Sequence, residues 1–338
     1  MNMTTSDQAD QERGLPPGLR LPGSGALRRS KLLHYLRHLL IYLAPRGRYR
    51  RRLGAMLRAA GTQDSAEVEG RVNYYNKLAE PFALGPDAAP FRASPFMRRR
   101  NYYMDLYAYT RYFDPSLRLY YVFGDVWEVP ERPSIVKARP IEGDNARSVL
   151  FNLNKVRHFV FVSDAKPFAS KLDKLVWRGN AFQENRRRFL SQYFAHPLCD
   201  VGHAHDSEPD NPWRRPPLTI REQLRHKFVL SMEGNDVATN LKWIMASNSL
   251  CFMAKPRRES WFMEGRLAPD HHYVLLRDDY SDLPDKMKHY SANTAEALRI
   301  VANAHRYVAQ FGDPAREDLV SLLVLKKYFD LSGQGAER

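Results

Sequence analysis

The stretch KFVLSMEGNDVATNLKWIMASNSLCFMA (227–254) carries the clearest pattern in this chain of 338 residues. An apolar run leads to Gly234, a helical pattern follows over 236–247, and a second apolar run occupies 249–254. Strand, glycine turn, helix and strand in this order predict a βαβ unit with parallel strands. The stretch therefore indicates an open α/β fold, in which ligands bind beyond the carboxyl ends of the strands.

The turn inside this unit is a candidate anion site. Asn235 or Asp236 would cap the following helix, and the free N–H groups and positive dipole of that helix would suit a diphosphate. Every βαβ unit needs such a turn, so a plain connection remains the alternative.

Strand and helix patterns alternate on both sides of this unit, which argues for parallel α/β sheets. Further strands are expected at 117–124, 158–163, 174–179 and 272–276. Further helices are expected at 184–194, 219–225, 281–290, 293–311 and 316–330. The segment 203–218 is rich in proline and predicts a loop.

A second strand, turn and helix occur in LVWRGNAFQENRRRFL (175–190). Arg178 lies at the end of this strand, and Gly179 with Asn180 forms the turn. Arg186 lies in the helix, where its side chain could fold back over a phosphate at the turn. The planar fork of arginine suits phosphate. The alternative is a solvated basic face of the helix.

A candidate general base lies in YYVFGDVWEVPERPSIVKARPI (120–141). An apolar strand ends at Gly124, and Asp125 follows it. A carboxylate at a strand end beside a cleft is well placed to accept a proton. The alternative is that Asp125 only stabilises the turn, which is a common role of this residue type.

Charge and cysteine content indicate where in the cell the protein works. Net charge is +14, and residues 1–60 hold eleven Arg and one Lys against three acids, so most excess charge is N-terminal. We expect a disordered tail over 1–29 and a basic amphipathic helical segment over 30–60. Its part 30–53 would suit an anionic membrane surface. Two cysteines, no signal peptide and no run long enough to span a membrane favour the cytoplasm, with peripheral association at the inner face.

Two clusters carry metal-ligand residue types, but neither has convincing spacing. CDVGHAHD (199–206) places His203 and His205 in the proline-rich loop, without a helical ligand spacing. In RDDYSD (277–282), Asp282 directly precedes Leu283–Pro284, which favours a helix cap. We therefore expect no metal and no cofactor.

Taken together, these segments resemble glycosyltransferase family 90 over about residues 70–330. Their order and spacing carry the resemblance more than any one of them. The segments are RVNYYNKL (71–78), FGDVWEVPERPSIVKARPI (123–141), NKVRHFVFVSD (154–164), KLVWRGNAFQENR (174–186), GNDVATNLKWIMASNSLCFM (234–253), ESWFMEGRLAPDHHYVLL (259–276) and DYSDLPDKMKHY (279–290).

The resemblance implies a glycosyltransferase-B-like α/β fold, with two Rossmann-like domains facing a cleft and the basic helix preceding them. The expected domains are an acceptor-side domain over 61–165 and a sugar-nucleotide-binding domain over 166–330. The reaction would be inverting and metal-independent. The acceptor would be a glycan or glycolipid of the cell envelope, such as lipopolysaccharide core or capsule.

The resemblance also implies residue roles. Asp125 matches the proposed base of the animal relatives, and Arg186 matches the arginine that holds the donor diphosphate, with UDP as the nucleotide that the family implies. Asn180 replaces a serine. Asn240 stands where animal relatives carry a phosphate-binding arginine, and Lys242 could supply that charge instead.

Two further side chains are candidates for binding the donor, and a different class of protein remains an alternative. Asp236 and Glu259 are candidates for the hydroxyl groups of the sugar or ribose. The alternative is a non-catalytic nucleic-acid-binding or envelope-assembly scaffold protein. We expect no nucleic acid, because the excess charge lies mostly in the first 60 residues rather than in a basic stripe along the fold.

Overall fold

The computed structural model describes residues 36, 40–41, 44–59, 65–91, 100–205, 208 and 210–335. The chain divides into two compact units. Unit 1 contains Val160–Pro256 and Arg266–Gly312, and unit 2 contains Arg28–Phe159, Arg257–Gly265 and Asp313–Arg338. The tail expected over 1–29 and most of the first part, 30–43, of the helical segment expected over 30–60 lie outside the described residues.

Unit 1 is built on a five-stranded parallel sheet with the order β12-β10-β9-β7-β8. Its strands are β7 (Leu172–Gly179), β8 (Cys199–His203), β9 (His226–Leu230), β10 (Leu250–Ala254) and β12 (Val274–Leu276). The chain runs from β7 outward to β8 and then returns to β9 on the other side of β7. The order therefore reverses between β7 and β9, and such a switch point is where doubly wound sheets open a crevice at their carboxyl ends.

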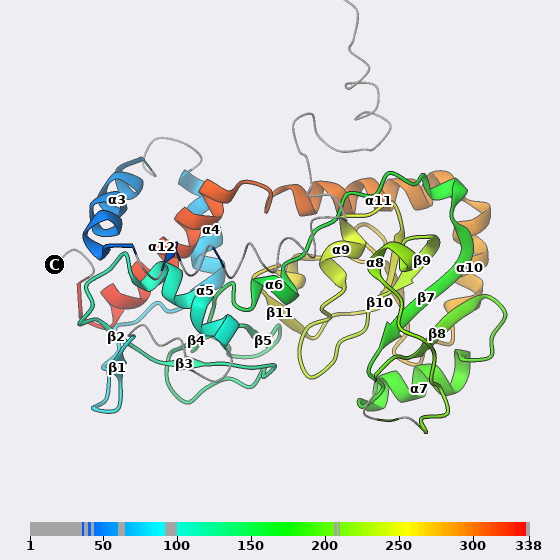
Figure 1. The fold of residues 1–338 in the computed structure, drawn as a ribbon, viewed down its shortest axis with the longest axis horizontal. Coiled ribbons are helices and arrows are strands. Elements are labelled where there is room, and N and C mark those ends of the chain that lie inside the picture. The colour runs from blue at the N-terminus through cyan, green and yellow to red at the C-terminus, as the bar shows by residue number, and fades with distance from the viewer. Residues whose placement is uncertain are drawn as a thin grey trace, which may run out of the picture. The chain divides into compact units, whose positions relative to one another are not determined.

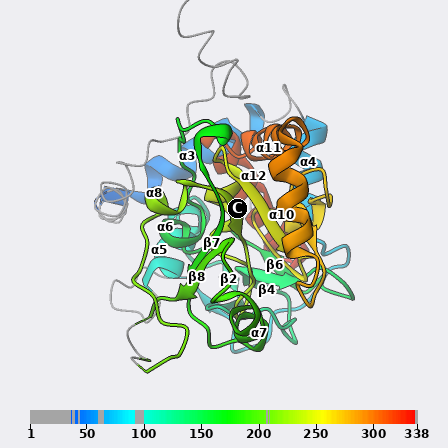
Figure 2. The same cartoon turned by 90° about the vertical axis from the view of Figure 1, so that its right-hand side faces the viewer.

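The helices of unit 1 connect and cover these strands. Figures 1 and 2 show α10 and α11 packed side by side. The helices are α7 (Glu184–Tyr193), α8 (Ile220–Gln223), α9 (Leu241–Met245), α10 (Leu283–Ala292) and α11 (Thr294–Ala309), with the 3₁₀ turn η1 (Phe168–Ser170). Thr219 and Glu222 form a reciprocal capping box that starts α8.

The predicted βαβ unit is confirmed, because β9 and β10 pair in parallel. The start of its helix was predicted wrongly. α9 begins at Leu241 with Asn240 as the N-cap, so neither Asn235 nor Asp236 caps it. The backbone N–H of Gly234 instead donates to the Asp236 carbonyl, which makes a tight turn, and the Asp236 side chain is buried. A short connection of bends and turns therefore separates the glycine turn from the helix.

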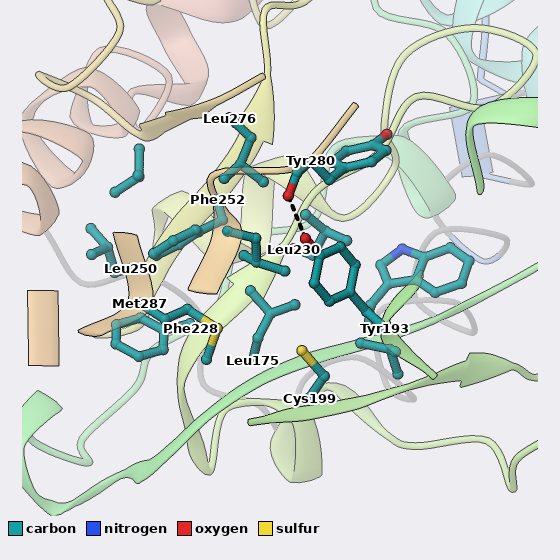
Figure 3. Close-up of a cluster of buried hydrophobic side chains, with 14 of the residues drawn as sticks. Leu175, Tyr193, Cys199, Phe228, Leu230, Leu250, Phe252, Leu276, Tyr280 and Met287 are labelled. Atoms are coloured by element: carbon teal, nitrogen blue, oxygen red, sulfur yellow. Dashed lines mark hydrogen bonds between the residues drawn. The ribbon is translucent and has the colours of Figure 1, made fainter. Parts of the chain in front are cut away.

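The core of unit 1 lies between the sheet and its helices. Figure 3 shows Leu175, Phe228, Leu230 and Phe252 from three neighbouring strands in one cluster. The hydroxyl of Tyr193 crosses this cluster to donate to the Tyr280 carbonyl at 2.6 Å. A polar group buried in an apolar cluster needs such a partner, and this bond fixes α7 against the segment before α10.

Unit 2 has a smaller parallel sheet with the order β3-β4-β6, together with two short antiparallel pairs, β1-β2 and β11-β5. Its strands are β1 (Ala89–Pro90), β2 (Arg118–Leu119), β3 (Tyr121–Val122), β4 (Ser134–Val136), β5 (Ala138–Pro140), β6 (Ser148–Leu150) and β11 (Arg258–Ser260). Its helices are α3 (Arg46–Ala59), α4 (Ser65–Tyr75), α5 (Arg100–Thr110), α6 (Lys155–His158) and α12 (Pro314–Leu331), with the turn η2 (Glu264–Arg266).

Three expected elements differ from those of the structure. The strand expected over 117–124 is divided into β2 and β3. The run 158–163 is not a strand, because it begins at the end of α6 and continues as irregular chain. Residues 316–330, expected in the domain 166–330, lie in α12, which packs on α4 in unit 2. None of the described helices is long and apolar enough to cross a membrane.

Candidate active site

The first candidate site lies at the switch point of the unit 1 sheet, where Arg186 joins the turns that follow β7 and β9. Its guanidinium donates from Nη1 to the Asn180 carbonyl at 2.9 Å. On the other side, Nε donates to the Glu233 carbonyl at 3.1 Å and Nη2 to the Met232 carbonyl at 3.1 Å. One cation thus holds both turns beside the crevice.

The local sequence explains why Arg186 lies there. It belongs to the first turn of α7, and helical side chains point back toward the N-terminus. Its guanidinium lies over the Trp177 ring, 5.6 Å from the ring centroid. A β-carbon at Gly179 would stand 2.6 Å from that ring, and one at Gly234 would stand 3.0 Å from Nη2. The two glycines therefore leave the space that Trp177 and Arg186 occupy.

Two further hydrogen bonds join the start of α7 to the turn after β9, and the sequence did not predict them. The Gln183 side-chain amide donates to Asn235 Oδ1 at 2.8 Å, and Asn185 Nδ2 donates to the Glu233 carbonyl at 3.3 Å. Nothing in the spacing of a single stretch predicts such pairs, because they form only when β7 and β9 become neighbours.

Other residues expected to bind the donor have structural partners. Arg178 points toward β8, where Nη2 donates to Asp200 Oδ1 at 2.7 Å. Asn240 donates to the Leu230 carbonyl at 2.9 Å and so holds the start of α9 at the end of β9. Lys242 is buried. The structure thus brings Gly179, Asn180, Arg186, Gly234 and Asn235 together, while Arg178 and Asn240 bond to protein groups beside these turns.

The second candidate site surrounds Asp125 in unit 2. Gly124 has a φ of +133°, a conformation that glycine adopts without strain, and it turns the chain at the end of β3. The Tyr102 hydroxyl donates to Asp125 Oδ1 at 2.7 Å, and Lys137 Nζ donates to the same oxygen at 2.6 Å. Arg157 Nη1 donates to Oδ2 at 3.0 Å. The carboxylate therefore has three donors from three different segments.

These donors decide the charge of the carboxylate. Burial raises the pKa of Asp125, but attraction and a hydrogen bond from Lys137, with the Tyr102 hydrogen bond and the charge of Arg157, hold it well below its usual range. Asp125 is therefore ionised at neutral pH, as a proton acceptor must be. The sequence identified Asp125 as the candidate base, but it identified none of the three donors around it.

Glu259 lies in unit 2 and is buried. Its Oε1 accepts from Arg139 Nε at 2.8 Å, and its Oε2 accepts from the Tyr74 hydroxyl. The hydrogen bond and the charge of Glu259, added to burial, raise the pKa of Tyr74. A carboxylate with these two partners holds β11 on β5, and the arrangement gives no support to a role in binding donor hydroxyls.

The clusters with metal-ligand residue types have other roles where they are described. His203 Nδ1 accepts from the Ala181 backbone N–H at 3.0 Å, and its Nε2 lies 3.1 Å from the His205 carbonyl. Asp282 is the N-cap residue of α10 and accepts from the Arg277 N–H. Over the described residues, no group of three or more His, Cys, Asp or Glu side chains could hold a metal ion.

The fold and the first site define a doubly wound α/β protein with an arginine at the switch point of its larger sheet. The profile described as glycosyl transferase family 90 matches residues 152–317. The chain is 45% identical to "O-glucosyltransferase LpsA" of Dichelobacter nodosus over 306 residues, which are 89% of this chain and 96% of that protein. It is also 30% identical to "Uncharacterized protein 035R" of Invertebrate iridescent virus 3 over 92 residues, 27% of this chain and 8% of that protein.

The chain therefore belongs to glycosyltransferase family 90 and is a glycosyltransferase. Its substrates are a sugar donor and an acceptor.

Proposed function

We propose that this protein is an inverting O-glucosyltransferase that moves glucose from UDP-glucose to a hydroxyl group of a cell-envelope glycan, such as lipopolysaccharide core or capsule. The similarity over nearly the whole length of an O-glucosyltransferase supports the reaction and the sugar. The uracil nucleotide, the acceptor and the glycosyltransferase-B arrangement of the two units rest on the family.

The donor diphosphate is proposed to bind at the switch point of unit 1. The single observation that carries this is the position of Arg186, which lies between the turns after β7 and β9. A guanidinium beside a developing diphosphate charge stabilises the leaving group, and preorganised donors of this kind contribute about 3–4 kcal/mol each in the transition state. Arg186, Gly179, Asn180, Gly234 and Asn235 form this proposed site.

Asp125 is proposed as the general base. It takes the proton of the acceptor hydroxyl, and the acceptor oxygen attacks the anomeric carbon as the bond from that carbon to the diphosphate breaks. Attack opposite the leaving group inverts the anomeric configuration. The ionised state of the Asp125 carboxyl supports this role.

The reaction is proposed to need no metal, because Arg186 supplies the positive charge at the diphosphate site. Purified protein should therefore unfold at a higher temperature with UDP-glucose, and EDTA should not reduce the shift. A ligand at 100 times its dissociation constant adds about 2.7 kcal/mol to the free energy of unfolding, which thermal unfolding detects readily. GDP-mannose serves as the control nucleotide sugar. A shift that requires Mn²⁺ contradicts metal independence, and no shift with any UDP-sugar contradicts the donor.

The protein is also proposed to work in the cytoplasm, at the inner face of the membrane. α3 supports this, because Arg48, Arg51 and Arg52 are exposed while Leu53 is buried. Basic residues near an anionic lipid surface contribute about 1 kcal/mol each. Vesicles of phosphatidylglycerol should therefore carry the protein upward in a flotation gradient, and vesicles of phosphatidylcholine should not.

The matched variants for this experiment each lose three exposed cations. Replacing Arg48, Arg51 and Arg52 with glutamine should abolish flotation at 0.15 M salt. Replacing the exposed Arg221, Arg225 and Lys288 of unit 1 should leave it intact. Equal losses in both variants would mean that net charge, rather than α3, attracts the vesicles.

A further inference from the structure

The two oxygens of Asp125 have different surroundings. Oδ1 accepts two hydrogen bonds, from Tyr102 and from Lys137, and His158 Nε2 lies 3.9 Å away. Oδ2 accepts one hydrogen bond, from Arg157. A carboxylate oxygen offers about two lone-pair sites. Oδ1 is therefore saturated, and Oδ2 is the oxygen with capacity for a further hydrogen.

The donors to these two oxygens also differ in freedom. The Lys137 side chain is 2% exposed and follows β4 directly, so the surrounding fold holds it. The Arg157 side chain is 56% exposed. An exposed arginine can swing away at little cost, whereas a buried ammonium cannot. An incoming hydroxyl can therefore displace Arg157 from Oδ2 without disturbing the bonds at Oδ1.

Lys137 has a second partner that fixes its direction. Its Nζ lies 3.2 Å from His158 Nε2, and His158 is buried. An ammonium group only donates hydrogen bonds, so Nε2 accepts and the imidazole is neutral, with its proton on Nδ1. His158 therefore holds the ammonium between itself and the carboxylate.

We propose that Lys137, held by His158, is a positioning residue that keeps Asp125 ionised and turned so that Oδ2 receives the proton of the acceptor hydroxyl. This inference rests on the proposed role of Asp125 as the base. The acceptor O–H bond breaks and an O–H bond forms at Oδ2, while the acceptor oxygen bonds to the anomeric carbon and the diphosphate leaves with its electron pair. The hydrogen bond from Lys137 Nζ to Oδ1 stays in place throughout.

The electrostatics agree with this geometry. The charged and titratable groups that face the carboxyl are Tyr102 from α5, Lys137 from the segment between β4 and β5, and Arg157 and His158 from α6. Burial alone would raise the pKa of Asp125, and Lys137 is the largest of the causes that lower it. Removing the charge of Lys137 should therefore raise this pKa, because burial is then opposed only by the Tyr102 hydrogen bond and the charge of Arg157.

The test is the pH dependence of kcat/KM between pH 4.5 and 9. The wild-type profile should be flat on its acid side, because Asp125 stays ionised over this range. Lys137→Met should bring an acid limb into this range, because burial then raises the pKa of Asp125 against weaker opposition, and it should lower kcat. Lys137→Arg keeps the charge and should restore the flat profile. A purely structural lysine would change stability and leave the profile unmoved.

The matched control is Lys155→Met. Lys155 is another lysine of unit 2, three residues before His158, and its ammonium bonds to Tyr109 rather than to Asp125. Its loss should lower the melting temperature and leave the acid side of the profile flat. If Lys137→Met and Lys155→Met give the same profile as wild type, the inference is overturned.

A second pair of variants tests the inference if Lys137→Met does not fold. His158→Gln keeps an acceptor for the ammonium and should retain wild-type kcat, whereas His158→Leu should lower kcat and leave the donor KM unchanged. Equal kcat values in both overturn the inference. Failure of the proposed base is a separate result, because it would be seen as full turnover by Asp125→Asn, whatever the lysine variants do.

Discussion

Replacing Arg186 with methionine should lower kcat/KM for glucosyl transfer by about 10²–10³-fold, the usual effect of removing one donor to a developing negative charge. The guanidinium holds the turns after β7 and β9 through the carbonyls of Asn180, Met232 and Glu233. Methionine has a similar stem and fills the space over Trp177, so the loss reports on the charge and the hydrogen bonds. Steady-state kinetics with UDP-glucose measures the effect.

The matched control for this prediction is Arg188→Met, two residues further along α7. Arg188 is exposed, and its guanidinium lies 3.8 Å from Glu184 on the same helix. An exposed pair of this kind contributes about 0.3–0.5 kcal/mol, so transfer should stay near the wild-type rate. Arg186→Lys keeps the positive charge but lacks the planar guanidinium, so its transfer rate should lie between those of the two methionine variants. Equal rates for the methionine variants of Arg186 and Arg188 would exclude Arg186 from the donor site.

The sequence predicted most strands of unit 1 but placed the start of one helix wrongly. The apolar runs that became β7, β9, β10 and β12 were identified, because fully buried parallel strands read as continuous apolar segments. The start of α9 was not. The stretch 236–240 has residues compatible with a helix, but Asn240 bonds to the Leu230 carbonyl and begins the helix there. A side-chain bond to a neighbouring strand overrides local propensity.

The second unit exposes another limit of sequence reasoning. α12, at the end of the described chain, packs on α4. In the same unit Trp261 stacks on Tyr75 of α4, with 3.8 Å between the ring centroids. A helical pattern shows that one face is buried, but not against which partner. The donors around Asp125 were missed for the same reason, because Lys137 and Arg157 meet the carboxylate only after the sheet β3-β4-β6 and α6 have formed.

Asp125→Asn should lower kcat by about 10²–10⁴-fold, the range that a general base contributes, and leave the binding of UDP-glucose unchanged. The amide keeps the shape of the side chain and can accept at one oxygen, but it cannot take up a proton at neutral pH. Single-turnover transfer measures the chemical step, and thermal shift with UDP-glucose measures binding. An Asn variant that turns over at the wild-type rate would remove Asp125 from the mechanism.

This variant has a second effect that must be separated from the first. The pKa of Asp125 is lower in the folded protein than its unfolded value of about 3.9. The carboxylate therefore stabilises the fold fully above that value, and the contribution is lost as pH falls through the folded pKa. At pH 7 the Asn variant lacks this contribution, and the buried ammonium of Lys137 loses its anionic partner. Breaking a fully buried pair from one side costs about 3–5 kcal/mol, and the partial exposure of Asp125 and the hydrogen bond to Asn both reduce that cost.

The double variant Asp125→Asn with Lys137→Met separates the two effects. Removing both charges leaves no unpaired ammonium, and replacing a buried pair with uncharged groups is often neutral or stabilising. Its melting temperature at pH 7 should therefore lie above that of Asp125→Asn, while its transfer rate should stay as low. Recovery of stability without recovery of turnover assigns the lost rate to the missing base. If turnover returned with stability, the carboxylate would be needed only to neutralise Lys137, and the proton of the acceptor would have to leave by another route.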